Sequence, residues 1–224
     1  MQHQPLPIDK VKLVIFDWDN TLAETRTPLT FAVNQILKDY GMPDWEEVKK
    51  LRDTNLSFRD NFPRIFGSKA EEAYKKYAAI YLQNVKNLIS SFKGTQEVLN
   101  WLKAHGVKIA IMTNKDRRLL EYELPLLFEP KLFDRIVCGH EAPRDKPYPD
   151  HAQYTIHGLL PEEEVSPETV WVVGDSPQDS MCACGAGVLP IRIGHPIWGD
   201  EEKYAKNIIH YNSFEDFYAD LSKN

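Results

Sequence analysis

The sequence lacks the features that mark membrane, nucleic-acid-binding and disulfide-bonded proteins. No apolar run reaches the roughly 18 residues that a membrane-spanning helix needs. No block of lysine and arginine occurs, and the net charge is −6, which argues against nucleic acid as the main partner. There are only three cysteines, Cys138, Cys182 and Cys184. This odd number, without a recognisable signal peptide, predicts reduced thiols in a cytoplasmic protein.

Internal repeats and low-complexity stretches are absent as well. What remains is a chain of 224 residues, 42% of them hydrophobic, which permits a sizeable core in one large domain or in a domain with an insert. The acidic balance does not exclude an anionic substrate, because a local site can carry the opposite charge.

Short apolar segments alternate with longer amphipathic segments over most of the chain. Five apolar segments are predicted to be buried strands, at residues 11–16, 107–112, 136–138, 169–173 and 189–193. Ile208 and Ile209 form a candidate for a short sixth strand. Helical patterns separate these strands, so we predict a doubly wound parallel α/β sheet, with the carboxyl ends of its strands along one edge.

Residues 25–90 differ from the rest because they contain helical patterns and no strand. We predict an α-helical domain at 25–90, inserted into a core domain formed by residues 1–24 and 91–224. Tyr74, Tyr77 and Tyr81 lie along one face of a predicted helix in this insert. We expect this tyrosine stripe to pack in the interior, and contact of one tyrosine with a substrate is the alternative.

Two carboxylates, Asp17 and Asp19, follow the first predicted strand directly. Ligands of open α/β sheets bind just beyond the carboxyl ends of strands. The two negative charges repel each other, and a divalent cation would relieve that repulsion because hard cations prefer oxygen ligands. The alternative is a simple turn, since Asp and Asn favour turns after strands.

The later strands also end in polar residues. The predicted topology brings the whole set to one edge of the sheet: Asp17, Asp19, Thr113, Asn114, Lys146, Asp175 and Asp179. Some of these residues have structural alternatives, because Thr113 and Ser176 could be helix N-caps and Asp179 could merely pair with Lys146. Other polar residues nearby are expected to have no role in the site: Lys115 and Arg144 as surface charges, and His140, His151 and His195 as ordinary loop histidines.

Four short motifs follow one another in order at these strand ends: Asp17-x-Asp19-x-Thr21, Thr113-Asn114, Lys146-Pro147, and Gly174-Asp175-Ser176 with Asp179. In this order they resemble the motifs of the haloacid dehalogenase-like hydrolase superfamily. The helical insert resembles the cap of its phosphoglycolate-phosphatase-like branch. Trp18 and Asn20 depart from that branch, which more often has Phe and Gly there, and neither position carries the chemistry.

The resemblance implies a role for each motif residue. Asp17 would be the nucleophile that forms an aspartyl phosphate, and Asp19 the general acid and base. Thr113, Asn114 and Lys146 would hold the phosphoryl oxygens. The resemblance also implies a Mg²⁺ site, with ligands from Asp17, the backbone carbonyl of Asp19, Asp175 and Asp179. Asp179 would either bind the metal through water or orient Lys146.

The predicted function is therefore that of a Mg²⁺-dependent phosphatase acting on a small phosphomonoester, with a small phosphorylated metabolite as its partner. A phosphomutase of the same superfamily is one alternative, and a binding module that retains the fold without turnover is another. Dehalogenation is disfavoured because that reaction needs no metal, whereas Asp19 and the carboxylates of the implied metal site suit phosphorus chemistry. The substrate itself and the oligomeric state stay open.

Overall fold

The computed structural model describes residues 6–53, 56–194 and 208–223. His195 lies outside the described residues. A six-stranded sheet has the order β5-β4-β1-β6-β7-β8, and every neighbouring pair is parallel. Its strands are β1 (Leu13–Phe16), β4 (Lys108–Met112), β5 (Arg135–Val137), β6 (Val170–Gly174), β7 (Leu189–Ile193) and β8 (Ile209–Tyr211). The predicted parallel sheet is confirmed, including the short sixth strand.

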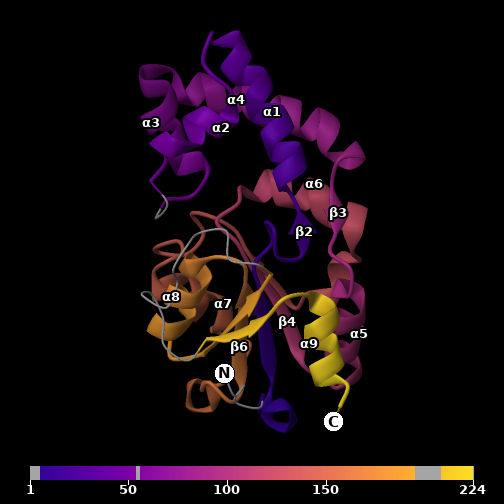
Figure 1. Cartoon of the computed structure of the whole chain (residues 1–224). Helices are drawn as coiled ribbons and strands as arrows, with labels where there is room; N and C mark the ends of the chain where they lie inside the picture. The colour runs from indigo at the N-terminus through magenta and orange to yellow at the C-terminus, as the bar shows by residue number, and fades with distance from the viewer. Residues whose placement is uncertain (1–5, 54–55, 195–207, 224) are drawn as a thin grey trace.

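Helices cover both faces of this sheet, as Figure 1 shows. They are α5 (Thr95–Ala104), α6 (Arg117–Leu127), α7 (Pro149–Ile156), α8 (Pro177–Gly185) and α9 (Phe214–Leu221). Successive residues of β1 point to opposite faces, so Val14 and Phe16 pack in a cluster with α5, α6 and α9, and Leu13 and Ile15 in a cluster with α7 and α8. All four residues are completely buried, which explains the unbroken apolar run of this central strand.

The helical segment (residues 25–90) lies beyond one edge of the sheet in Figure 1. Its helices are α1 (Arg26–Asp39), α2 (Trp45–Val48), α3 (Phe62–Phe66) and α4 (Ala70–Asn84). They surround a hydrophobic cluster of their own, which includes Val33, Phe62, Tyr77 and Tyr81. Tyr77 and Tyr81 are therefore interior residues, as expected of the tyrosine stripe. Leu119 of α6 joins the same cluster and connects it to a helix that covers the sheet.

A two-stranded antiparallel ribbon marks the points where the chain enters and leaves the helical segment. It pairs β2 (Ala23–Glu24) with β3 (Ser90–Ser91). Short 3₁₀ helices complete the described part of the chain: Ile8–Lys10, Lys49–Leu51, Arg59–Asn61, Gly67–Lys69, Val85–Asn87, Pro130–Leu132 and Glu162–Glu164. In the described ranges we find no helix that combines the length and the apolar character needed to cross a membrane.

Candidate active site

Three carboxylates meet at the carboxyl edge of the sheet. Asp17 follows β1, Asp175 follows β6, and Asp179 lies in the first turn of α8. Because β1 and β6 are parallel neighbours, their ends are adjacent, and the Asp17 N–H donates to the Val173 carbonyl at 2.9 Å. One oxygen from each of the three carboxylates lies within 4.8 Å of the other two, and all three residues are buried. The convergence predicted from the strand ends is present for these three residues.

Lys146 binds two of these carboxylates at once. Its Nζ lies 2.6 Å from Asp17 Oδ1 and 2.6 Å from Asp179 Oδ1. The other oxygen of Asp179 accepts hydrogen bonds from the backbone N–H and the hydroxyl of Ser176, at 3.1 and 2.6 Å. Ser176 is the N-cap of α8, so the start of this helix holds Asp179 toward Lys146. Both oxygens of Asp179 are thus already engaged by protein groups.

Gly174 is the residue that leaves room for Asp179. A Cβ atom at this position would lie only 2.3 Å from the carboxylate carbon of Asp179. We expect Gly174→Ala to displace Asp179 from Lys146. The predicted phosphatase activity should fall about 10²-fold, because the geometry of the site is lost. Overpacking should also lower the free energy of unfolding by roughly 1–3 kcal/mol. Activity assays and thermal unfolding measure the two effects.

Gly187→Ala is the matched control for this prediction. Gly187 has φ +74°, and a Cβ there meets no atom within 4 Å. Alanine at Gly187 is strained by roughly 1–2 kcal/mol, yet it should leave activity per folded molecule unchanged. Equal activity losses in the two variants would show that Gly174 has no specific role beside Asp179.

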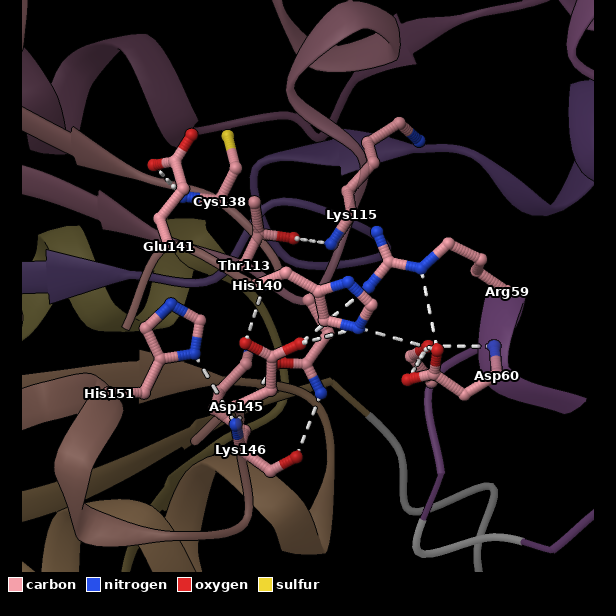
Figure 2. Close-up of polar contacts among 12 residues, drawn as sticks. Arg59, Asp60, Thr113, Lys115, Cys138, His140, Glu141, Asp145, Lys146 and His151 are labelled. Atoms are coloured by element: carbon pink, nitrogen blue, oxygen red, sulfur yellow. Dashed lines mark hydrogen bonds and ion pairs between the residues drawn. The ribbon is translucent and has the colours of Figure 1, made fainter. Parts of the chain in front are cut away.

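The turn after β4 holds the Lys146 loop in place. Asn114 donates from Nδ2 to the Lys146 carbonyl at 2.8 Å and accepts from the Lys146 N–H at 3.1 Å. His151 Nδ1 also accepts from this N–H, at 3.3 Å, a contact that Figure 2 shows. The hydroxyl of Thr113 accepts from the Lys115 N–H at 3.1 Å. Thr113 is not a helix N-cap, because Asp116 has that position in α6.

The expectation that His151 is an ordinary loop histidine is wrong. It lies in α7 and is completely buried. Burial and the nearby charge of Lys146 lower its pKa to about 3, so the ring stays neutral and its Nδ1 can accept a hydrogen bond. The sequence offers no signal for this role, since the loop that folds His151 against Lys146 is irregular. His140, by contrast, is largely exposed, with Nε2 3.5 Å from Asp60 Oδ1.

The electrostatics of the carboxylate group favour a bound cation. Burial raises the pKa of Asp17 to about 7; the charge of Lys146 opposes this shift, and the charges of Asp179 and Asp19 add to it. Burial, together with Asp17 and Asp179, raises the pKa of Asp175 well above its usual range. Three buried carboxylates thus lie close together, and the Lys146 ammonium pairs with only two of them, Asp17 and Asp179. A hard divalent cation such as Mg²⁺ would restore ionisation with ligands that it prefers, so the donor set fits this metal.

Asp19 faces a different partner. Its carboxylate is not part of the close group of Asp17, Asp175 and Asp179, and its Oδ1 lies 2.7 Å from Lys115 Nζ. Lys115 was expected to be a surface charge, and this expectation is wrong, because only 7% of its side chain is exposed. Tyr81 of α4 covers it, with its hydroxyl 3.3 Å from the ammonium. Arg144 is exposed and paired with Asp150, as expected of a surface charge.

Glu123 is a buried charged residue that the sequence analysis missed. Its Oε1 lies 3.0 Å from Lys115 Nζ, and its Oε2 accepts from Trp18 Nε1 at 2.6 Å. Leu119 and Leu120, four and three residues earlier, are on the buried face of α6. The sequence did contain a signal for it, because a glutamate three or four residues from buried leucines lies on the apolar face of the helix. A carboxylate on that face needs a partner inside the protein.

The helical segment contacts the site edge at further points. Arg26, in the first turn of α1, has Nη2 3.9 Å from Asp175 Oδ2. Arg59 Nη2 lies 3.7 Å from Asp145 Oδ2, and Figure 2 shows its guanidinium pointing toward the Asp145 loop. A cavity of about 370 Å³ lies between residues 56–60 and this loop, with Asn114 and Lys146 in its wall. The cavity therefore lies between the helical segment and the loop that carries Lys146.

Comparison with known proteins places these features in a family context. Residues 14–193 match the sequence model of the haloacid dehalogenase-like hydrolases. Pyrophosphatase PpaX of Bacillus mycoides is 27% identical over 190 residues, which cover 85% of this chain and 86% of that protein. Phosphoglycolate phosphatase 1 of Pseudomonas aeruginosa is 30% identical over 194 residues, which cover 79% of this chain and 67% of that protein.

A solved structure shows the same fold. The crystal structure of CbbY from Rhodobacter sphaeroides in complex with phosphate matches with a TM-score of 0.76 and 23% identity, covering 95% of this chain and 99% of that one. At this identity the likeness concerns the fold alone. It includes the helical segment, since nearly the whole of both chains is covered.

Proposed function

The chain belongs to the haloacid dehalogenase-like hydrolases, and on that premise we propose that it is a cytoplasmic, Mg²⁺-dependent phosphatase that hydrolyses a small phosphomonoester through an aspartyl phosphate. The observation that carries the proposal is the 2.6 Å contact of Lys146 with Asp17, within a group of three buried carboxylates. Phosphoryl transfer to a carboxylate requires a nucleophile, a cation for the phosphoryl oxygens and oxygen ligands for a metal. These groups are gathered at the carboxyl edge of the sheet, around the end of β1.

The reaction has two steps. In the first, an oxygen of Asp17 attacks phosphorus, the bond from phosphorus to the ester oxygen breaks, and Asp19 donates its proton to that oxygen. In the second, Asp19 takes a proton from water, whose oxygen attacks phosphorus and frees phosphate from Asp17. The Thr113 hydroxyl, the Asn114 backbone N–H and the Lys146 ammonium hold the phosphoryl oxygens during both steps.

When bound, Mg²⁺ supplies positive charge that stabilises the phosphoryl oxygens. Asp17 and Asp175 provide its carboxylate ligands, and the backbone carbonyl of Asp19 provides a further oxygen. We assign Asp179 to the orientation of Lys146, because its oxygens already accept hydrogen bonds from Lys146 and Ser176. This assignment keeps the ammonium beside the nucleophile.

We propose that residues 25–90 form a lid domain on the core of residues 1–24 and 91–224. The contacts of Arg26 with Asp175 and of Arg59 with Asp145 support a position over the site edge. A lid in this position excludes water from the phosphoryl group and limits the size of the substrate. The cavity of about 370 Å³ beside Lys146 suits a small phosphorylated metabolite.

A phosphate-release screen tests the proposal. The panel contains phosphoglycolate, sugar phosphates and nucleoside monophosphates, each with and without Mg²⁺. Inorganic pyrophosphate is included because one relative, which matches 85% of this chain, is a pyrophosphatase. Phosphate release from a monoester would support the proposal. Phosphate release from pyrophosphate alone would mean that the protein is a pyrophosphatase instead. An isomerised sugar phosphate would indicate a phosphomutase, and no turnover of any compound would favour a binding module.

Metal removal is the second test. We expect EDTA to lower phosphatase activity about 10²-fold or more, because a bound metal supplies several kcal/mol of transition-state stabilisation. Added Mg²⁺ should restore activity. Circular dichroism before and after chelation checks that the fold persists. Full activity after exhaustive chelation and dialysis would contradict a metal-dependent mechanism.

A further inference from the structure

A chain of buried polar contacts lies beside the site. Lys115 Nζ is 2.7 Å from Asp19 Oδ1, 3.0 Å from Glu123 Oε1 and 3.3 Å from the Tyr81 hydroxyl. Glu123 in turn accepts from Trp18 Nε1 at 2.6 Å. These five residues come from the loop after β1, the turn after β4, α6 and α4. The contacts therefore join the nucleophile loop, the sheet domain and the helical segment at one ammonium.

Within the described part of the chain, the ammonium of Lys115 is enclosed by these partners. Its side chain is 7% exposed, and that of Glu123 is completely buried. In Figure 2 the Lys115 side chain extends away from Asp145 and His140, so it does not face the cavity beside Lys146. A lysine with this direction is poorly placed to bind the phosphoryl group. Burying an ammonium is costly unless it is paired, and here the pairing is with Asp19 and Glu123.

The contacts restrict the direction of the Asp19 carboxylate. About a third of the Asp19 side chain is exposed (32%), so without a partner the carboxylate could rotate about its side-chain bonds. Lys115 holds one of its oxygens, and Glu123 holds Lys115 through a second ion pair. Trp18, next to the nucleophile in sequence, holds Glu123. The position of Asp19 thus depends on a lysine that is itself fixed by a buried carboxylate.

We propose that Lys115 is a positioning residue that holds the Asp19 carboxylate in the orientation required for proton transfer to and from the phosphoryl site. This inference rests on the proposed function, in which Asp19 is the general acid and base. Lys115 acts through Asp19 and does not contact the reacting atoms. Its loss should therefore reproduce part of the kinetic defect caused by the loss of Asp19.

The test compares Lys115→Met, Asp19→Ala and the double variant on two substrates. An aryl ester such as p-nitrophenyl phosphate needs little protonation of its leaving group, whereas an alkyl ester needs much more. We expect Lys115→Met to lower kcat for the alkyl ester roughly 10–10²-fold, a part of the usual contribution of acid–base catalysis. We expect a smaller decrease for the aryl ester in the step that releases nitrophenol, and a KM within about threefold of wild type in both cases.

The double variant gives the sharper result. If Lys115 acts only through Asp19, adding Lys115→Met to Asp19→Ala should slow the alkyl reaction by no more than about threefold. Effects that multiply in full would overturn the inference, as would equal losses on both substrates in the rate of the first step, cleavage of the ester, in Lys115→Met. If Asp19→Ala itself fails to distinguish the two esters, the proposed role of Asp19 and this inference both fall. Multiplying effects, by contrast, overturn this inference alone.

Two further variants separate positioning from folding. Lys103→Met removes another paired lysine, whose Nζ lies 2.7 Å from Asp134, and it should leave the ratio of alkyl to aryl rates unchanged. If Lys115→Met folds poorly, Lys115→Met with Glu123→Gln removes both buried charges, and the new amide can still accept from Trp18. The same loss of alkyl turnover is expected in that variant, and wild-type turnover there would overturn the inference.

Discussion

Asp17→Asn is expected to abolish turnover of every substrate, with a loss of roughly 10⁴–10⁶-fold, the range observed when an enzyme loses its nucleophile. An amide oxygen carries no charge, and attack by it cannot produce an aspartyl phosphate. The replacement has the same shape, and its amide oxygen can still accept from Lys146, so the surrounding geometry should persist. Phosphate release under saturating Mg²⁺ measures the loss, and acid quenching should trap no phosphoenzyme.

The same substitution should not destabilise the metal-free protein. The pKa of Asp17 is about 7 in the folded protein against an ordinary 3.8, chiefly because the group is buried. A carboxylate with a raised folded pKa opposes folding as pH rises from 3.8, and the penalty is complete above about 7. Removing this charge should leave the melting temperature in EDTA at neutral pH equal to that of wild type or higher.

A surface aspartate provides the control for Asp17. Asp39 is exposed at the end of α1, and Asp39→Asn should change neither activity nor stability measurably. Turnover by Asp17→Asn within 10²-fold of wild type would exclude Asp17 as the nucleophile. A clear fall in its melting temperature would contradict the electrostatic account of the buried carboxylates.

Asp19→Ala is expected to lower the steady-state rate by about 10²–10⁴-fold, the usual contribution of a general acid and base. With p-nitrophenyl phosphate the first step needs little protonation, so formation of the phosphoenzyme should be slowed least. Its hydrolysis still needs the missing base. Rapid-quench kinetics should therefore show a burst of nitrophenol near one equivalent per site, followed by a slow phase.

The fold should survive this substitution. Lys115 keeps its 3.0 Å ion pair with Glu123, so its buried charge is not left alone. Asp19→Asn is the matched control, because it keeps the size of the side chain and a hydrogen-bond acceptor for Lys115 but cannot transfer the proton. Equal bursts in the two variants would assign the defect to proton transfer. Equal rate losses for aryl and alkyl esters, with no burst, would show that Asp19 has another role.

The sequence predicted the sheet well because the signals for it are local. The apolar run of β1 is long enough and branched enough to require burial on both faces, and all four of its residues are buried. Parallel connection then brings the ends of β1 and β6 to the same edge. Those two facts place Asp17 and Asp175 on one edge, and the pairing of β1 with β6, which only the structure gives, makes them neighbours there.

The sequence predicted the surroundings of Asp19 poorly because they depend on contacts between distant segments. Lys115 stands in a polar turn, where exposure is the ordinary expectation. It is buried because Tyr81 of α4 covers it and Glu123 of α6 pairs with it. The sequence around Tyr81 or Glu123 does not indicate that either residue contacts Lys115. His151 is a similar case, since only the folded loop brings it to the Lys146 N–H.

Taken alone, the sequence determined the succession of strands and helices along the chain and the edge of the sheet at which the polar residues gather. It also determined which functional groups are available at that edge. These follow from periodic burial and from chain connectivity, which act over a few residues at a time. The tertiary structure decided which groups touch: Lys146 with Asp17 and Asp179, and Lys115 with Asp19. A buried charge takes the partner that packing places within about 3 Å, and packing between segments far apart in the chain is set only when the whole core forms.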